Sequence, residues 1–417
     1  MQGKRVEVEI TGVAHGGIFV ARHEGRVIFV SDAIPGETVV AEITDDAKSS
    51  FWRADTVEVL SESPQRREHV WDASSLDRAP GLRAGGAEFG HIRLAHQREL
   101  KRDVIVDSIK RMARLDVDVT VEALPSGETP GADADEDGTG WRTRVRLHVG
   151  EDGTVGPYAA RSHRVIPVTG LPLAVPEART LAPLDRKIPG AEFVDIVVPW
   201  EGAGFLVVGD AVSRATPRAE SIIERVGERE FRLDSRGFWQ VHRHAAQALT
   251  TAVQQAIDEA QFDPRAANLD LYGGVGLLAA AAADRFGSAT RITTVESDPV
   301  ATGHARANLA EWAGAAAETG RVERYLKHLG ANAGERSRLR GATVILDPPR
   351  AGAGKAVVGE LVRLEPTQIV YVACDPVALA RDVALFAARG YELARLRAFD
   401  LFPNTHHVEA VATLARR

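Results

Sequence analysis

The sequence predicts an α/β protein whose C-terminal part is a Rossmann-like, mostly parallel sheet, preceded by a small β-barrel and a mixed α+β segment. Residues 1–62 contain short alternating apolar runs separated by Gly-Gly, Glu-Gly and Pro-Gly, which is typical of a small closed barrel. Residues 63–235 combine a helical pattern at 94–115 with further strand-like runs. In residues 236–417 apolar strands alternate with helices, as in a parallel doubly wound sheet.

Composition limits the class of protein. The chain has 417 residues, more than one core usually holds, so we expect several domains. Its single cysteine excludes an internal disulfide framework and any zinc or iron–sulfur site built from several cysteines. Because no run of about 20 apolar residues occurs, we expect a cytoplasmic protein without a membrane partner, and we expect a monomer.

Charge is unevenly distributed along the chain. The net charge of −7 includes five acids within residues 125–140, which lack apolar periodicity and are expected to form a disordered insertion. The remainder is close to neutral, so basic surfaces are possible. In the barrel, basic residues alternate with Phe19, Phe29 and Trp52, which suits phosphate contact and base stacking, although a generic β-module explains the pattern equally well.

The first motif is a glycine-rich turn. The run GGVGLLA contains Gly274 and Gly276 and lies between a predicted strand at 267–272 and a predicted helix at 277–287. Glu296 ends the next predicted strand, where it can accept hydrogen bonds from ribose hydroxyls. We expect an adenosine-containing cofactor here. The pattern alone does not separate a dinucleotide from S-adenosylmethionine, and a structural tight turn stays an alternative.

A second motif, Asp347-Pro348-Pro349-Arg350, ends a later strand at 342–349. Two prolines remove two N–H donors and stop the strand, which would build a rigid ledge at the carboxyl edge of the sheet, where ligands bind. A simple strand stop is the alternative reading.

Cys374 ends the next predicted strand, at 368–374, at the same edge. Asp375 suits an N-cap and Pro376 the first helical position, so the thiol precedes a helix N-terminus whose dipole favours a thiolate. The charge of Asp375 opposes that effect. A lone cysteine on an apolar strand is most often a small buried hydrophobe, but its place after the ledge strand favours a chemical role.

Glu409 lies in the last apolar run. Segments 391–400 and 407–415 are expected to form an antiparallel hairpin at the edge of the sheet. The start of the last strand then lies where the parallel strands end. Topology therefore brings Asp347, Cys374 and Glu409 toward one crevice.

His406 and His407 precede Glu409 and raise the question of a metal site. Their spacing matches no strong metal signature, and adjacent histidines on a strand point to opposite faces. We expect no metal.

These residues resemble the S-adenosylmethionine-dependent RNA uracil-C5 methyltransferases, which make 5-methyluridine in ribosomal or transfer RNA. The first 60 residues are similar to a TRAM domain, and the C-terminal half is similar in GFWQVHRHAAQAL, LDLYGGVGL, ILDPPRAG, YVACDPVALARD and FPNTHHVEAVATL. The resemblance implies a class I methyltransferase fold for 236–417, an RNA-binding central domain, S-adenosylmethionine as cofactor, and an RNA substrate, with ribosomal RNA ranked before transfer RNA.

The resemblance also implies site roles, with Cys374 as the nucleophile and Glu409 as the base. In that mechanism a thiolate adds to C6 of uracil, C5 takes the methyl group, and a carboxylate removes the C5 proton. Pro348 and Arg350 are expected to contact the substrate. The residues implied to surround the cofactor are Gln240, Tyr272, Gly274, Gly276, Glu296 and Asp347.

Three departures from the family pattern matter. Many relatives carry an iron–sulfur cluster on cysteines that include a Cys-Gly-Gly-Cys, whereas this chain has Ala84 and Ala87, so we expect no cluster. Asp375 replaces the usual Asn and is expected to raise the thiol pKa. Gly273 stands where Cys is usual and Leu277 where some members are polar; neither is expected to prevent cofactor binding.

Two other functions are compatible with some of these residues. Methylation of a base amino group also uses an Asp-Pro-Pro ledge, but it leaves Cys374 and Glu409 without a task. A non-catalytic RNA-binding protein derived from the enzyme would explain the acidic insertion and the lost cluster. Retention of the thiol, the carboxylate and the glycine turn speaks against it.

Overall fold

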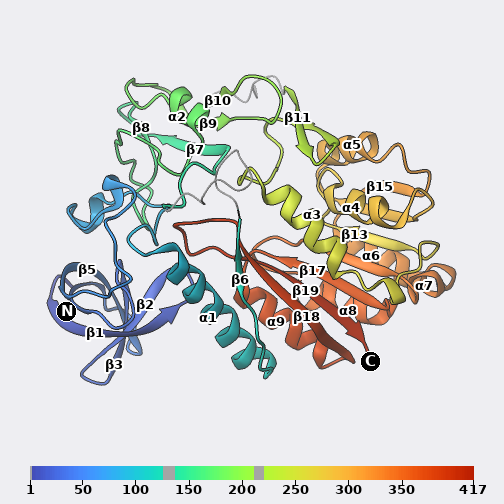
Figure 1. Cartoon of the computed structure of the whole chain (residues 1–417), viewed down its shortest axis with the longest axis horizontal. Coiled ribbons are helices and arrows are strands. Elements are labelled where there is room, and N and C mark those ends of the chain that lie inside the picture. Colours follow the sequence, from blue (N-terminus) through green and yellow to red (C-terminus); the bar gives the residue numbers. More distant parts are fainter. Residues whose placement is uncertain (1, 125–136, 211–219) are drawn as a thin grey trace.

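The computed structural model describes residues 2–124, 137–210 and 220–417. Most of the expected disordered insertion at 125–140 therefore lies outside the described residues. Figure 1 shows the N-terminal barrel, a central β-rich segment, and a C-terminal α/β region joined to the barrel by a long helix. No helix in these described ranges is long and apolar enough to cross a membrane.

The predicted barrel is confirmed. Its alternating pattern turns Val6, Val8 and Ile10 into a core that also holds Phe19 and Trp52. Strands close in the order β1-β2-β3-β5-β4, with the bounds β1 (Arg5–Ala14), β2 (Ile18–His23), β3 (Arg26–Ser31), β4 (Thr38–Asp45) and β5 (Phe51–Ser61).

The expectation that barrel aromatics stack on bases is wrong for two of the three. Phe19 is 0% and Trp52 5% exposed, because both fill the barrel core, and the guanidinium of Arg26 covers the Trp52 ring at 4.4 Å. Phe29 is half-buried against Phe51, with ring centroids 5.3 Å apart.

The helix predicted at 94–115 forms α1 (Leu94–Ala113), which packs between β1 and α9 (Pro376–Ala387) (Figure 1). Its Ile105 and Ile109 share a core cluster with residues of the C-terminal region. The chain then forms β6 (Val121–Ala123), which pairs in parallel with the last-but-one strand of the sheet.

The central segment holds a four-stranded sheet in the order β10-β9-β7-β8 and a separate hairpin of β11 and β12. Its elements are η1 (Asp72–Ser74), η2 (Pro80–Leu82), β7 (Arg144–Val149), β8 (Val155–Gly156), α2 (Pro176–Leu181), β9 (Ala191–Val197), β10 (Phe205–Asp210), β11 (Ser221–Val226) and β12 (Arg229–Asp234). Domain limits at 62 and 235 stay a prediction; α1 and β6, from inside the second segment, pack on the C-terminal region.

The C-terminal sheet has eight strands in the order β15-β14-β13-β16-β17-β19-β18-β6. The alternation of strands and helices predicted from residue 236 is confirmed, although β15 was not predicted, because its sequence AAAET consists mainly of Ala and Glu, which are depleted in strands. The strands are β13 (Asn268–Leu271), β14 (Ile292–Glu296), β15 (Ala315–Thr319), β16 (Thr343–Leu346), β17 (Gln368–Ala373), β18 (Tyr391–Asp400) and β19 (Glu409–Arg416).

Helices cover both faces of this sheet. Along β17, Val370 and Val372 face one core cluster while Ile369 and Tyr371 face the other, which is the period-two alternation of a strand buried on both sides. The helices are α3 (Ala245–Ala256), η3 (Glu259–Gln261), α4 (Leu277–Phe286), α5 (Pro299–Asn308), α6 (Val322–Ala331), α7 (Ala333–Leu339), α8 (Gly354–Leu364) and α9.

The last two long strands form the expected antiparallel hairpin, but not at the edge. β19 lies between β17 and β18, and β6 covers β18. The pairing of β6 with β18 could not be predicted, because β6 has only three residues, which are too few to show a periodic pattern.

Candidate active site

Strand register brings the predicted catalytic residues to one edge of the sheet. Leu346 of β16 pairs with Tyr371 of β17, so Asp347 leaves the sheet beside the end of β17. β17 and β19 are antiparallel with Ala373 opposite Ala410, which sets Cys374 beside Glu409. The sheet thus places Asp347, Cys374 and Glu409 together, as the sequence predicted.

Cys374 sits between the end of β17 and the start of α9. The predicted cap is confirmed, because Asp375 Oδ1 accepts a hydrogen bond from the Ala378 N–H at 2.8 Å and Pro376 is the first helical residue. The cap orients the chain immediately after the thiol and leaves Cys374 half-buried.

The thiol is not activated by its surroundings in the free protein. The pKa of Cys374 is raised to about 12, chiefly by burial and then by the charges of Glu409 and Asp347, while the charge of Arg350 opposes the rise. Burial and these two carboxyls therefore outweigh the backbone hydrogen bond at Cys374, which favours the thiolate. The acids that oppose it come from β19 and the end of β16, whereas Asp375 faces the Ala378 N–H and the barrel.

Three carboxyl groups of the site, those of Glu409, Asp347 and Asp270, have raised pKa values. Burial raises the pKa of Glu409 well above its ordinary value, and the charge of Asp347 adds to this. Burial also raises the pKa of Asp347 to about 7, with a further contribution from Asp270, whose own pKa burial raises to about 6. Each carboxyl holds its proton more tightly than in water because charge is disfavoured there.

The glycine turn forms a cradle beside β14. Gly274 has φ +54° and Gly276 φ +90°, a backbone region that favours glycine. A Cβ on Gly276 would lie 3.1 Å from Leu309, while one on Gly274 would meet nothing within 4 Å, so the turn is open on that side. The Gly274 N–H donates to Glu296 Oε2 at 3.3 Å, which brings the predicted turn and carboxylate together.

Residues below the turn are unusually constrained. Tyr272 has φ +64°, held by its N–H bond to Val295 O at 2.9 Å. A Cβ on Gly273 would lie 1.9 Å from Thr294 Oγ1 and 2.5 Å from Asp270 Oδ2. Thr294 thus fills the space that a side chain at position 273 would need, and the expectation that Gly273 permits cofactor binding stays a prediction. Asp270 Oδ1 is buried and has no hydrogen-bond partner within the described ranges.

Leu277 directly follows Gly276 and is the first residue of α4. Gln240 is partly buried and follows Trp239, a residue of the large core cluster that also holds Val275 and Leu278; its place in the cofactor site stays a prediction. Leu277 is partly buried against the same cluster. The open turn, the Glu296 carboxylate and the unpartnered Asp270 oxygen fit the adenosyl part of S-adenosylmethionine.

The proline ledge presents two different side chains. Pro348 is buried and Arg350 is exposed. Arg350 Nη2 donates to Nε2 of His407 at 3.3 Å, so the guanidinium lies over the loop that precedes Glu409. The charge of Arg350 also favours the Cys374 thiolate.

His406 and His407 lie in the loop before β19, not on a strand, which corrects the argument that they point to opposite faces. Their ring centroids are 4.0 Å apart, and His406 Nδ1 lies 3.5 Å from Glu88 Oε2. Among the residues that the structure describes, no group of three or more His, Cys, Asp or Glu could hold a metal ion.

The barrel reaches this edge, which the sequence did not indicate. His15 Nε2 lies 3.2 Å from Asp375 Oδ2, and a Cβ on Gly17 would lie 2.8 Å from the Cβ of His406. The turn between β1 and β2 therefore contacts the segment after Cys374 and the loop before Glu409. Its Gly16-Gly17 pair could be predicted only as a turn.

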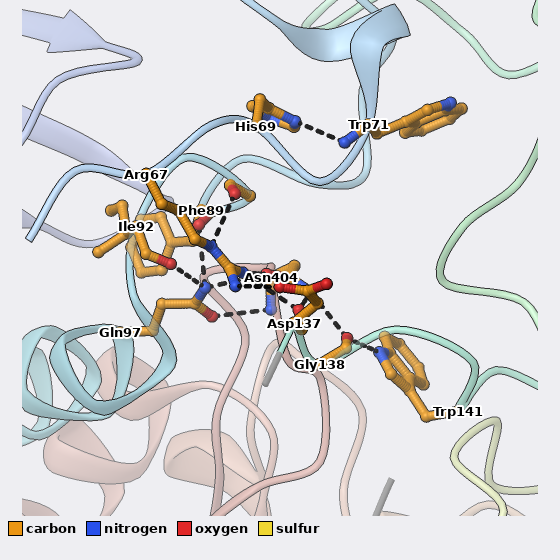
Figure 2. A network of polar contacts seen from close by, with 11 residues as sticks. Arg67, His69, Trp71, Phe89, Ile92, Gln97, Asp137, Gly138, Trp141 and Asn404 are labelled. Carbon is orange, nitrogen blue, oxygen red and sulfur yellow. Dashed lines mark hydrogen bonds and ion pairs between the residues drawn. The ribbon is translucent and has the colours of Figure 1, made fainter. Parts of the chain in front are cut away.

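Asn404 fixes the loop that leads to Glu409 (Figure 2). It is 0% exposed, and its side chain accepts hydrogen bonds from Arg67 at 2.6 Å and Gln97 at 3.0 Å. It donates to the carbonyls of Asp137 and Gly138 at 2.8 and 2.7 Å. The end of the insertion expected to be disordered is thus tied to the loop, which corrects that expectation for residues 137–140.

The positions matching the family's Cys-Gly-Gly-Cys hold no metal ligand. Ala84 is 3% exposed and forms a β-bridge with Ala159, and Ala87 is 1% exposed in a cluster with Trp141 and Leu173. Methyl groups packed in this way cannot bind iron, so these residues do not fit an iron–sulfur cluster.

Comparisons with known proteins agree with this architecture. Residues 1–55 match the model of the TRAM domain, and residues 231–417 match that of tRNA (Uracil-5-)-methyltransferase. An uncharacterized RNA methyltransferase of Streptomyces avermitilis is 39% identical over 99% of this chain and 98% of its own length. Another from Bifidobacterium longum is 32% identical over 99% of this chain and 97% of its own.

A solved structure extends the similarity to the whole fold. The tRNA (uracil-54, C5)-methyltransferase of Pyrococcus abyssi, in complex with S-adenosyl-L-homocysteine, has a TM-score of 0.68 at 20% identity. It covers 99% of this chain and 100% of its own. The predicted class I fold with an N-terminal barrel is confirmed.

Proposed function

Because the chain belongs to the S-adenosylmethionine-dependent RNA uracil-5-methyltransferase family, we propose that it methylates C5 of a uridine in RNA through a covalent bond between Cys374 Sγ and C6 of the base. The observation that carries the proposal is the meeting of Cys374 and Glu409 across β17 and β19, beside the ledge at Asp347. A thiol and a carboxyl at one sheet edge supply the nucleophile and the base that this reaction needs.

S-Adenosylmethionine supplies the methyl group on a positively charged sulfonium. Within the chain, the open turn at Gly274 and Gly276 admits the ligand, and Glu296 is placed to orient ribose hydroxyls. Gln240, Tyr272 and Asp347 complete the proposed cofactor site.

Cys374 must lose its proton before it adds to C6. Its raised pKa shows that burial and two nearby carboxyls oppose this loss in the free protein, while Arg350 favours it. A positive charge bound beside Asp347 and Glu409 would lower the pKa of the thiol, so nucleophile activation depends on ligand binding.

Glu409 completes the reaction. After C5 carries the methyl group, the Glu409 carboxylate takes the C5 proton, and the electrons of that C–H bond form the C5–C6 double bond. The C6–S bond breaks, and its electron pair returns to Cys374 as a thiolate. The raised pKa of Glu409 makes its ionised form a stronger base than an ordinary carboxylate.

We further propose ribosomal RNA as the substrate, in preference to transfer RNA. In this proposal Pro348 and Arg350 hold the target base, and the enzyme acts as a cytoplasmic monomer without an iron–sulfur cluster. Mapping of 5-methyluridine by mass spectrometry in ribosomal and transfer RNA, from cells with and without the protein, decides between the two RNAs. Methylation of a base amino group in the same samples would favour the other enzyme class.

The covalent mechanism is tested with cofactor labelled in its methyl group. Glu409→Gln should accumulate methylated RNA joined to the protein, because addition and methyl transfer precede proton removal. A slowly migrating labelled band is expected on denaturing electrophoresis, and Cys374→Ala should abolish both the band and turnover.

Glu318→Gln, which alters an exposed carboxyl at the end of β15, serves as the matched control and should turn over normally. Full turnover by Glu409→Gln or Cys374→Ala would contradict the mechanism. RNA binding without methylation by the unaltered protein would favour the non-catalytic alternative.

A further inference from the structure

A cavity of about 520 Å³ lies in the central segment, between the Gly85-Gly86 loop, strand β7 and residues 157–163, which follow β8. None of the residues proposed above for catalysis or for the cofactor lines it. The two glycines belong to the stretch in which many relatives place cluster cysteines, so this surface has no role in the reaction described so far.

The wall of the cavity is basic. It contains Arg142, Arg146, Arg161, His148 and His163, and no Asp or Glu lines it. This contrasts with the net charge of −7 for the whole chain. A one-sign lining of this kind attracts anions.

Arg142 is the least neutralised of these cations. Arg146 pairs with Asp195 at 2.7 Å and Arg161 pairs with Asp55. No carboxylate of the described ranges lies within ion-pair distance of Arg142. Its Nε donates a hydrogen bond to Arg144 O at 2.9 Å. Burial lowers the pKa of Arg142, so an anion at this guanidinium would relieve an unpaired charge.

The same wall carries aromatic rings. His148 and Tyr158 stack with centroids 3.5 Å apart and planes at 8°, and His163 meets Tyr158 edge-on at 5.2 Å. Trp71 also lines the cavity. Rings beside guanidinium groups are the combination that binds an unpaired nucleotide, with the base on the rings and the phosphate on the cations.

Arg142 also connects the cavity with the active edge. The charge of Arg350, on the proline ledge, lowers its pKa, and that of Glu88, which pairs with His406, raises it. Arg142 follows Trp141, whose ring meets that of Phe402 edge-on with centroids 6.1 Å apart, and Phe402 lies in the loop that precedes Glu409. A nucleotide bound here would therefore lie beside the segment that leads to the active edge.

We propose that this cavity binds an unpaired nucleotide of the substrate RNA near the target uridine, with its base against the ring set of Trp71, His148 and Tyr158 and its phosphate at Arg142. The proposal rests on the proposed function for the presence of RNA. The cavity would thus bind the substrate RNA at a second nucleotide, next to the uridine that is methylated.

Fluorescence anisotropy with labelled ribosomal and transfer RNA fragments tests the proposal on the full chain. Tyr158→Ala should weaken RNA binding by about fivefold to a hundredfold, the usual effect of losing a stacking ring, whereas Tyr158→Phe should bind normally. Arg142→Met should weaken binding and reduce the slope of log K against log salt by roughly one phosphate contact. Arg186→Met, an exposed cation outside the cavity, is the matched control.

Binding of S-adenosylhomocysteine by calorimetry should be unchanged in all variants, which shows that they are folded. Unchanged RNA affinity in Tyr158→Ala and Arg142→Met would overturn the proposal. Tight binding of free uridine monophosphate that is lost in Tyr158→Ala, with normal RNA affinity, would instead assign the cavity to a mononucleotide and also overturn it.

The two proposals can fail separately. If Tyr158→Ala loses RNA affinity while the unaltered protein does not methylate, the cavity proposal stands and the catalytic one fails. If Cys374→Ala abolishes methylation while Tyr158→Ala binds and methylates RNA normally, the reverse holds.

Discussion

His15 of the barrel and Asp375, the residue after Cys374, are 3.2 Å apart between Nε2 and Oδ2. Asp375 uses its other oxygen to cap α9, so one carboxylate joins the barrel to the helix that starts beside the nucleophile. In the family resemblance this position is an Asn. The added charge is thus matched by a partner from another part of the chain.

This pair should contribute stability only within a limited pH range. The hydrogen bond that His15 donates to Asp375 raises the pKa of His15, so its contribution is complete below pH 6.5 and is lost as the pH rises through the raised value. For Asp375, burial opposes ionisation, but His15 and the helix cap outweigh it and lower the pKa, so the contribution is lost in acid below the ordinary value of 3.8. The window therefore runs from about pH 4 up to the raised pKa of His15, which lies above 6.5.

A double-mutant cycle with His15→Gln and Asp375→Asn measures the pair. Asn keeps the helix cap, so the cycle isolates the charge interaction, expected at ~0.2–1 kcal/mol because both groups are partly exposed. Melting temperatures near pH 6 should show coupling that disappears near pH 9. Equal coupling at both pH values would contradict the prediction.

Asp347 should destabilise the folded protein when it ionises. Burial raises its pKa from 3.8 to about 7, so the folded state binds the proton more tightly than the unfolded chain, and stability falls as the pH rises from about 4 to about 7. Asp347→Asn should therefore stabilise the protein, and the gain in free energy of unfolding should be larger at pH 8 than at pH 5 by roughly 2 kcal/mol. Thermal unfolding checks this. Glu318→Gln is the control; an equal effect of Asp347→Asn at both pH values would refute the prediction.

Glu296 should contribute to cofactor affinity. Glu296→Ala removes the carboxylate beside the Gly274 N–H and should weaken S-adenosylhomocysteine binding by roughly 1–3 kcal/mol. Glu318→Ala, on the neighbouring strand, should bind normally. Calorimetry that found NAD binding more tightly than S-adenosylhomocysteine would show that the cofactor site is wrongly assigned.

Asn404 should be more important for stability than its loop position indicates. Asn404→Ala leaves the partners of a fully buried amide unpaired and should lower the free energy of unfolding by about 3 kcal/mol. Its φ is +66°, so Asn404→Gly should be less harmful by about 1 kcal/mol. Chemical unfolding of both variants provides the test; stability equal to that of the unaltered protein would show that the network is not required.

The purified protein should be colourless, because Ala84 and Ala87 replace cysteines that hold an iron–sulfur cluster in many relatives. Iron analysis and the visible spectrum of purified protein should show no cluster, because the single cysteine, Cys374, cannot hold one. Iron near one atom per chain, with a charge-transfer band, would reject this prediction.

Local patterns predicted much of the fold and part of the site. Alternating apolar residues identified the barrel, and strand–helix alternation identified the C-terminal sheet. The cap at Asp375-Pro376 and the turn at Gly274 beside Glu296 were predictable because their contacts lie within a few residues or on adjacent strands.

Contacts between distant segments were not predictable. β6 has three residues and pairs with a strand from the other end of the chain, so it carries no periodic pattern. His15 and Asn404 each act through partners that lie far along the sequence, and neither residue type identifies its partner.

The sequence by itself determined which chemical groups the protein has at the end of each strand: a thiol, a carboxyl, a glycine turn and a proline ledge. Only the tertiary structure decided their protonation. The helix that follows Cys374 favours a thiolate locally, but β16 and β19 bring Asp347 and Glu409 beside the thiol and burial removes water, which raises its pKa. Electrostatic energy depends on distance through space and on solvent exposure, and neither quantity is a property of neighbouring positions along the chain.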